Sequence, residues 1–129
     1  MRELQIEVAL AVVVRDGRLL AGRREAGTYL AGLRELPGGK LLQGETASVA
    51  AVRELLEETG LRASARRVLQ IVEHDYPDRT VRLHFIRCRE LDASLAPRSP
   101  FEWLPLDKIV PGDFPPANRQ FLEDLRLEA

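Results

Sequence analysis

Cysteine is almost absent from the sequence, which limits what can hold the fold together. Cys88 is the only thiol among 129 residues, so no disulfide can form within the chain. This fits a reducing compartment, and we expect a cytoplasmic protein. Long apolar runs are missing as well. No segment approaches the roughly 20 residues of a membrane helix, and residues 1–5 lack the pattern of a signal peptide, so we expect no association with a membrane.

An excess of charge of one sign is also missing. The chain has 19 basic and 20 acidic side chains, which gives a formal net charge of -1. Proteins that bind nucleic acid through bulk electrostatics show a basic excess, so we expect no stable nucleic-acid complex. A small anionic ligand held by a few local cations is compatible with this balance. The length suits a single domain over residues 1–129, and no pattern indicates an oligomeric state.

The periodicity of apolar residues predicts a mixture of strands and helices. Asp16-Gly17 and Pro77-Asp78-Arg79 are expected to form tight turns between strands. Residues 24–38 and 90–100 have little periodicity and predict loops, and a long loop in a compact domain usually serves function. The expected strands cover residues 6–14, 19–22, 67–76, 80–89 and 101–104.

Residues 46–59 give the clearest helical pattern. Thr46 is suited to cap the N-terminus of this helix, and Gly60 is suited to end it in a left-handed conformation. A second, amphipathic helix is expected after Pro115-Pro116. Its apolar face would carry Phe121, Leu122 and Leu125.

Three glutamates gather on one side of the helix over residues 46–59. At 100° per residue, Glu54, Glu57 and Glu58 fall within an arc of about 100°. The earlier turns of this arc carry short alanines, so the surface beside the carboxylates is expected to be shallow and open. The opposite side is expected to bury Val49, Val52, Leu55 and Leu56.

The clustered carboxylates need a compensating positive charge. Like charges four residues apart repel by about 0.2–0.5 kcal/mol per pair, and glutamates near the C-terminal end of a helix oppose its dipole. A divalent cation with oxygen ligands would compensate for this repulsion, and Arg53 can brace Glu57 from four residues away. The alternative is a solvated acidic helix face, which Glu57-Glu58 alone would not exclude.

A longer motif surrounds the glutamates and argues against that alternative. It spans 23 residues and has nine defining positions, all of which are filled. A chance match at a given start has a probability on the order of one in a billion. By this motif, the Nudix box, the chain resembles the Nudix hydrolases. The nine positions are Gly39, Glu45, Arg53, Glu54, Leu55, Glu57, Glu58, Gly60 and Leu61.

The resemblance to the MutT type of this family covers nearly the whole chain. It implies an α+β fold in which an α/β/α sandwich surrounds a mixed β-sheet. It also implies a metal-dependent hydrolase that lets water attack the β-phosphorus of a nucleoside triphosphate, which releases a monophosphate and pyrophosphate. The similar segments outside the box are 4–6, 23–24, 35–40, 76–79, 102–103 and 113–118.

The same resemblance implies roles for the box residues. Magnesium, or manganese as its substitute, would be held by the side chains of Glu54, Glu57 and Glu58 and by the backbone carbonyl of Gly39. Glu54 would also orient or deprotonate the attacking water. Arg53 would brace the glutamates, and Glu45 would act as an outer support.

The substrate would be held by residues from several segments. Arg24, with Arg23 in reserve, is the candidate phosphate contact because guanidinium forks match phosphate oxygens. For Arg23, an ordinary surface arginine is the alternative. Asn118 can offer a donor and an acceptor to a purine edge, with preference for 8-oxo-guanine, although asparagine at the start of a helix is often a cap. Leu36 would lie against the base.

Three positions depart from the MutT pattern. Leu36 replaces a phenylalanine, which weakens the expected packing against the base. Arg34 replaces the tryptophan of many relatives at the wall of the base pocket. Pro97 occupies the place of a glutamate, so a residue within 94–102 would have to supply any equivalent contact.

Two other functions remain open. The chain could be a pyrophosphohydrolase of CTP or modified pyrimidine triphosphates on the same scaffold. It could also be a non-catalytic Nudix domain that senses a nucleotide. Such domains typically lose box glutamates, whereas this chain keeps all of them.

Overall fold

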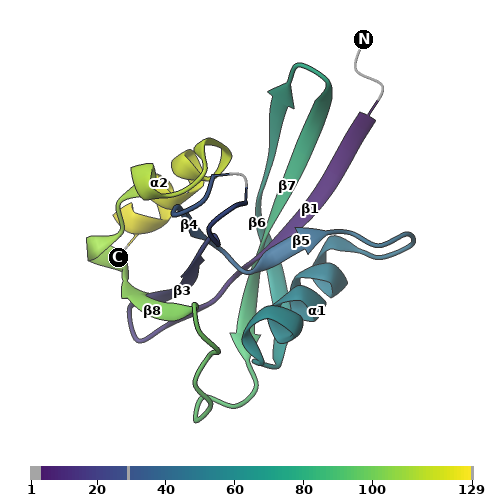
Figure 1. The fold of residues 1–129 in the computed structure, drawn as a ribbon. Coiled ribbons are helices and arrows are strands. Elements are labelled where there is room, and N and C mark those ends of the chain that lie inside the picture. Colours follow the sequence, from purple (N-terminus) through teal and green to yellow (C-terminus); the bar gives the residue numbers. More distant parts are fainter. Residues whose placement is uncertain (1–3, 29, 129) are drawn as a thin grey trace.

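A mixed four-stranded sheet forms the centre of the fold, which a computed structural model describes for residues 4–28 and 30–128 (Figure 1). Its strand order is β5-β1-β7-β6. β1 is parallel to β7, while β5 and β6 run antiparallel to their neighbours. The predicted α+β class with a mixed sheet is therefore confirmed. The strands are β1 (Leu4–Val12), β5 (Gly38–Lys40), β6 (Ala63–Tyr76) and β7 (Arg79–Glu90).

A second four-stranded sheet lies beside the first and is antiparallel throughout. The turn at Asp16-Gly17 joins two of its strands, and both residues take positive φ, as a tight hairpin requires. The predicted loop over residues 24–38 is wrong where β4 and the start of β5 interrupt it, because such short strands show no periodicity. The strands are β2 (Val14–Arg15), β3 (Arg18–Arg23), β4 (Arg34–Glu35) and β8 (Glu102–Pro105).

The two helices cover different parts of the sheets. α1 (Ala47–Thr59) packs on β1, β5, β6 and β7, and α2 (Arg119–Leu127) lies on the other side of the molecule (Figure 1). A 3-10 turn at Pro116–Asn118 precedes α2. None of the helices within residues 4–28 and 30–128 is long and apolar enough to cross a membrane.

The core consists of two clusters that share β1. Ala9 and Ala11 belong to the cluster beneath α1, whereas Val12 belongs to the cluster beneath α2, so successive side chains of the strand alternate between the two layers. The predicted apolar face of α2 is confirmed, and the ring of Phe121 stacks on that of Phe85 with centroids 4.0 Å apart. Cys88 is buried within the first cluster.

The predicted apolar face of α1 is partly wrong. Leu55 is buried, but Val49 is 57% exposed and Leu56 is 40% exposed. Ala50 and Ala51 are fully buried instead, so the open alanine surface predicted beside the glutamates is wrong at these two positions. Packing on the sheet decides this orientation, because small side chains at the contact let the helix approach closely.

Candidate active site

The caps of α1 set where its glutamates lie. The Thr46 hydroxyl accepts a hydrogen bond from the Val49 amide at 3.2 Å, and Gly60 ends the helix with φ 81°, as predicted. The helix then runs beside β5, which contributes Gly38 and Gly39. The Gly38 amide donates to Oε1 of Glu58 at 3.1 Å.

Gly39 lies directly under the carboxylate of Glu54. A Cβ atom at position 39 would lie 2.7 Å from Oε1 of Glu54, closer than side chains approach one another. Glycine at this position is therefore required for the carboxylate to pack against β5. The motif thus brings its first residue and its central glutamate together across two elements.

Glu54 and Glu58 form a crowded pair of carboxyl groups. Burial raises the pKa of Glu58 to about 8, assisted by the charges of Glu54 and Glu35 and by a hydrogen bond with Glu54, and opposed by the hydrogen bond from Gly38. The Glu54 side chain is only 16% exposed. Two acidic groups in such a place resist being ionised together unless a cation compensates.

Arg53 braces the acidic face, as expected. Its Nε and Nη2 atoms donate to the two carboxylate oxygens of Glu45 at 2.7 and 2.9 Å. Its Nη1 atom donates to Glu54 at 2.8 Å and to Glu57 at 3.3 Å. The hydrogen bonds from Arg53 lower the pKa of Glu45 to about 2, and the Leu42 amide adds to this effect. Glu45 therefore holds Arg53, and Arg53 orients Glu54.

Glu57 is more exposed than the other two glutamates. Its side chain is 57% exposed, and within the described part of the chain its carboxylate accepts a hydrogen bond from Arg53 alone. Among the residues that the structure describes, no three Asp, Glu, His or Cys side chains form a ready-made metal site. The metal role of Glu57 thus stays a prediction.

A cleft of about 370 Å³ opens in front of Glu58. Arg23 and Arg24 line it together with Glu35, and Arg24 donates to Oε1 of Glu35 at 3.3 Å. Arg23 is exposed and donates to the Gly32 carbonyl at 3.2 Å. Both arginines can reach an anion in the cleft, and Arg24 is the more deeply placed of the two.

A second hollow of about 170 Å³ adjoins the cleft, since Arg24 and Glu35 line both. Leu36 and Asn118 lie here with Gly39, as the substrate assignment expected. Asn118 directly precedes α2, but its side chain makes no capping hydrogen bond. Its Oδ1 atom is buried and has no hydrogen-bond partner within the described residues. The hydrogen bond that the helix-cap alternative requires is therefore absent, and a buried polar atom is left without a partner among the described residues.

Two functional candidates escaped the sequence analysis. Glu35 lies between the two hollows, and burial raises its pKa against the opposing charge of Arg24. The guanidinium of Arg98 donates to the Leu56 and Glu57 carbonyls at 3.1 and 3.2 Å, at the C-terminal end of α1. No local signal could have indicated this contact, because 41 residues separate Arg98 from Glu57.

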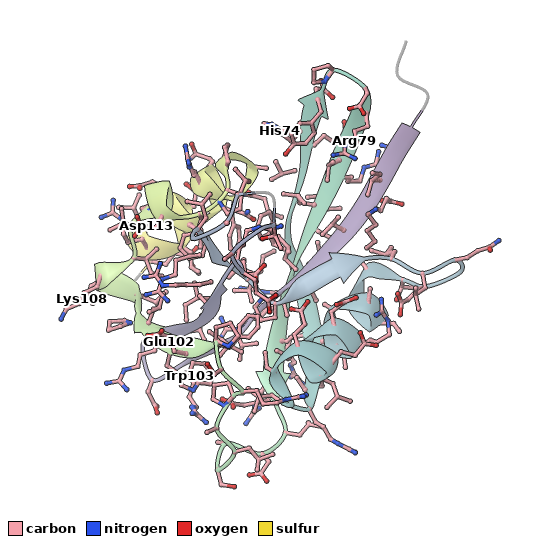
Figure 2. All side chains as sticks on the ribbon, viewed as in Figure 1. His74, Arg79, Glu102, Trp103, Lys108 and Asp113 are labelled. Carbon is pink, nitrogen blue, oxygen red and sulfur yellow. The ribbon has the colours of Figure 1, made fainter. Side chains whose placement is uncertain are left out.

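The departures from the expected pattern have visible consequences. Within residues 94–102, those that line the cleft are Ser99, Pro100 and Phe101, and none of them is acidic. Glu102 instead pairs with Arg34 at 3.3 Å. In Figure 2, Glu102 and Trp103 lie on β8, well away from His74 and Arg79 at the tip of the β6–β7 hairpin.

The paired carboxyl groups fit a divalent cation. Oxygen donors are the ligands that magnesium prefers, and a nearby cation reverses the effect of crowding on the pKa of a carboxyl group. Glu58, which lines the cleft, and Glu54, which is hydrogen-bonded to it, supply such donors. Gly39 leaves the space that the Glu54 carboxylate itself occupies against β5.

Comparison with known proteins decides the family. The NUDIX domain model matches residues 8–124. The chain belongs to the Nudix hydrolase family. An 8-oxo-dGTP diphosphatase of Escherichia coli (strain K12) is 33% identical over 128 residues, which cover 98% of each chain. A CTP pyrophosphohydrolase of the same organism is 38% identical over 79 residues, 61% of this Nudix hydrolase and 58% of that enzyme.

Solved structures agree with the fold of this Nudix hydrolase. The solution structure of the E. coli ORF135 protein superposes with a TM-score of 0.80 at 29% identity. The match covers 98% of this chain and 92% of that chain. A MutT Nudix hydrolase from Burkholderia pseudomallei has a TM-score of 0.79 at 28% identity and covers 94% of this chain and 98% of its own.

Proposed function

We propose that this Nudix hydrolase, as one domain over residues 1–129, hydrolyses 8-oxo-dGTP, and dGTP less well, to the nucleoside monophosphate and pyrophosphate. The carrying observation is the buried Oδ1 atom of Asn118, which has no hydrogen-bond partner among the residues that the structure describes and belongs to a residue that lines the hollow adjoining the cleft. An 8-oxo-dGTP diphosphatase is also among its similar proteins.

Asn118 supports the choice of base. A buried acceptor without a partner costs about 1–3 kcal/mol, so a ligand that supplies a donor relieves this cost. The N7 atom of 8-oxo-guanine carries a hydrogen, whereas N7 of guanine is an acceptor. The oxidised base can therefore satisfy Oδ1 of Asn118 in a way that guanine cannot.

The two hollows support the placement of the rest of the substrate. With the base beside Asn118 and Leu36, the triphosphate would extend toward Arg24, where a guanidinium can pair with phosphate oxygens. Glu58 lines the same cleft as Arg24. The phosphate chain would thus run from the base hollow to the glutamates of α1.

Hydrolysis requires a positioned water molecule. Glu54 would orient this water and take its proton as the new bond to the β-phosphorus forms. The bond from that phosphorus to the oxygen bridging the α- and β-phosphates breaks, and the bridging oxygen leaves with the monophosphate. Arg53 holds Glu54 for this task through its hydrogen bond at 2.8 Å.

A magnesium ion would complete the site. Glu54, Glu57, Glu58 and the Gly39 carbonyl would hold it, and it supplies charge neutralisation at the phosphoryl oxygens. Glu57 has to turn from Arg53 toward the other two glutamates for this purpose. Its exposure leaves the side chain free of packing that would prevent the movement.

A substrate panel with magnesium tests the choice of nucleotide. We expect kcat/KM to be highest for 8-oxo-dGTP, lower for dGTP and lowest for dCTP and CTP, with pyrophosphate as the second product. Equal kcat/KM values for 8-oxo-dGTP, dGTP and dCTP would refute the proposed specificity.

A second function, hydrolysis of CTP or modified pyrimidine triphosphates, has one structural feature in its favour. Arg34, which stands where many relatives have a tryptophan, is paired with Glu102, so it would not supply the aromatic packing expected against a purine. A CTP pyrophosphohydrolase is also among the similar proteins. Preference for dCTP or CTP in the panel would select this function.

Glu57→Gln distinguishes an enzyme from a non-catalytic sensor. We expect kcat to fall at least about tenfold with folding retained, because the exposed side chain contributes little packing. Glu73→Gln is the matched control, since Glu73 is also exposed and paired with an arginine. Unchanged hydrolysis in Glu57→Gln would exclude the assigned role of Glu57.

A further inference from the structure

We propose that a second, arginine-lined groove binds a compact oligophosphate anion, such as a diphosphate or triphosphate group. This groove has a volume of about 600 Å³ and shares no lining residue with the two hollows of the candidate active site. It lies where β2 meets the ends of β6 and β7 that are far from the hairpin tip, which His74 and Arg79 mark in Figure 2. Its arginines are Arg15, Arg66, Arg67, Arg87 and Arg89.

Three of these guanidinium groups are available for a ligand. The side chains of Arg66, Arg67 and Arg89 are exposed. None of their guanidinium groups makes a hydrogen bond or ion pair with another described residue. Arg15 is anchored differently, by an ion pair with Glu90 at 3.2 Å and by stacking 4.4 Å from the centre of the Trp103 ring. The groove therefore combines one fixed cation with several that have no internal partner.

The strand register places like charges together at some cost to the fold. Arg67 lies directly opposite Arg87 in the β6–β7 ladder, and like charges in such cross-strand pairs are destabilising. The register also shifts between Ala65 and Arg67, which leaves Arg66 as an extra residue in a bulge. Successive side chains of a regular strand point to opposite faces, yet Arg66 and Arg67 line the same groove.

This combination points to phosphate as the ligand chemistry. Arginine forks pair with phosphate oxygens in a bidentate manner, and an anion between Arg67 and Arg87 would remove their repulsion. A bulge that re-aims a side chain is a common feature of functional sites. This groove and the candidate active site have no residue in common, so anion binding in the groove does not depend on the proposed hydrolysis reaction.

The acidic neighbours favour a short anion over a nucleic-acid strand. Glu90 lines the groove, and the charges of Asp16 and Asp92 lie close enough to raise its pKa, although burial is the larger cause. These carboxylates would repel a long phosphate backbone that continued past the arginines. The formal net charge of -1 also gives the chain no general attraction for a polyanion.

Binding of inorganic tripolyphosphate to the metal-free protein tests this site apart from catalysis. In wild type, we expect amide chemical-shift changes at residues 14–15, 66–67 and 87–89. The double variant R66Q/R67Q should bind at least about tenfold more weakly, because hydrogen bonds between two charged groups are strong. The matched control R79Q/R82Q removes the same charge at the other end of the hairpin and should bind like wild type.

The stability of the variant separates lost binding from lost folding. R66Q/R67Q should be at least as stable as wild type, since it removes the Arg67–Arg87 repulsion. Unchanged affinity in this variant, or shift changes confined to Arg23 and Arg24, would overturn the proposal. So would a single-stranded oligonucleotide of roughly twelve nucleotides that binds the groove more tightly than tripolyphosphate.

Discussion

Replacement of Glu58 by glutamine should stabilise the metal-free protein at alkaline pH while it abolishes hydrolysis. Burial and the neighbouring Glu54 raise the pKa of Glu58 from 4.5 to about 8 in the folded chain. At pH values between these two pKa values, Glu58 keeps its proton in the folded protein and has released it in the unfolded chain. The free energy of unfolding of wild type must therefore fall as the pH rises through this window, and glutamine, which cannot ionise, removes the fall.

The size of the effect follows from the window and from the exposure of the group. Each pH unit lowers the free energy of unfolding by at most about 1.4 kcal/mol. Over the interval from pH 4.5 to about pH 8, the free energy of unfolding can therefore fall by at most about 5 kcal/mol. Glu58 borders the open cleft, so solvent screening reduces the value, and we expect a difference of about 2 kcal/mol.

Urea denaturation of the metal-free proteins between about pH 5 and pH 9 measures this difference. The curve of Glu58→Gln should rise above that of wild type as the pH increases, whereas the control Glu73→Gln should keep the wild-type slope. Parallel curves for wild type and Glu58→Gln would refute the burial of an ionisable pair at this position. Magnesium should stabilise wild type at alkaline pH and leave Glu58→Gln nearly unaffected.

Substitutions at three further positions test the surroundings of the carboxylate pair. The pKa of Glu45 is lowered to about 2 by Arg53, so its contribution to stability is present above about pH 4.5 and is lost as the pH falls toward 2. The difference in melting temperature between wild type and Glu45→Gln should therefore shrink on acidification, and a constant difference would contradict the ion pair. Arg98→Ala should lower the free energy of unfolding by about 1 kcal/mol, because two hydrogen bonds at the C-terminal end of α1 are lost. Arg98→Lys should restore part of this stability. If urea denaturation finds no loss of stability in Arg98→Ala, Arg98 does not stabilise the end of α1. Asn118→Ala should raise KM for 8-oxo-dGTP at least about tenfold, with a smaller change in kcat, since it removes a base contact. Steady-state kinetics with equal KM values would exclude Asn118 from recognition of the base.

Local features of α1 could be predicted from the sequence. Thr46 and Gly60 cap α1 as expected, because capping depends on the residues at the helix ends and their own backbone. The position of Gly39 against Glu54 also follows from the motif, since a close approach requires glycine. These features need no information from distant segments.

The face that α1 buries could not be predicted in the same way. Periodicity placed Val49 and Leu56 in the core, whereas the structure buries Ala50 and Ala51. Hydrophobicity alone favours the larger side chains, but the close approach of helix and sheet favours the smaller ones. This choice depends on what the helix packs against, which lies elsewhere in the chain.

Contacts between residues that are far apart in the sequence could not be predicted either. Arg98 reaches the end of α1 from a loop with no periodicity, and Glu35 comes near Glu58 only because β4 and α1 border one cleft. For Asn118 the sequence left a cap and a base contact as alternatives. The missing cap hydrogen bond argues against the first in three dimensions, and the base contact stays a proposal.

Paramagnetic line broadening by Mn²⁺ tests the central claim most directly, which is that the glutamates of α1 and the glycines of β5 hold a divalent cation. On titration of the wild-type protein, the amide signals of Gly38, Gly39 and residues 54–58 should broaden first. Excess magnesium should restore them, and the double variant E54Q/E58Q should lose the effect. Broadening centred on any other part of the chain, or equal broadening in the double variant, would contradict the account.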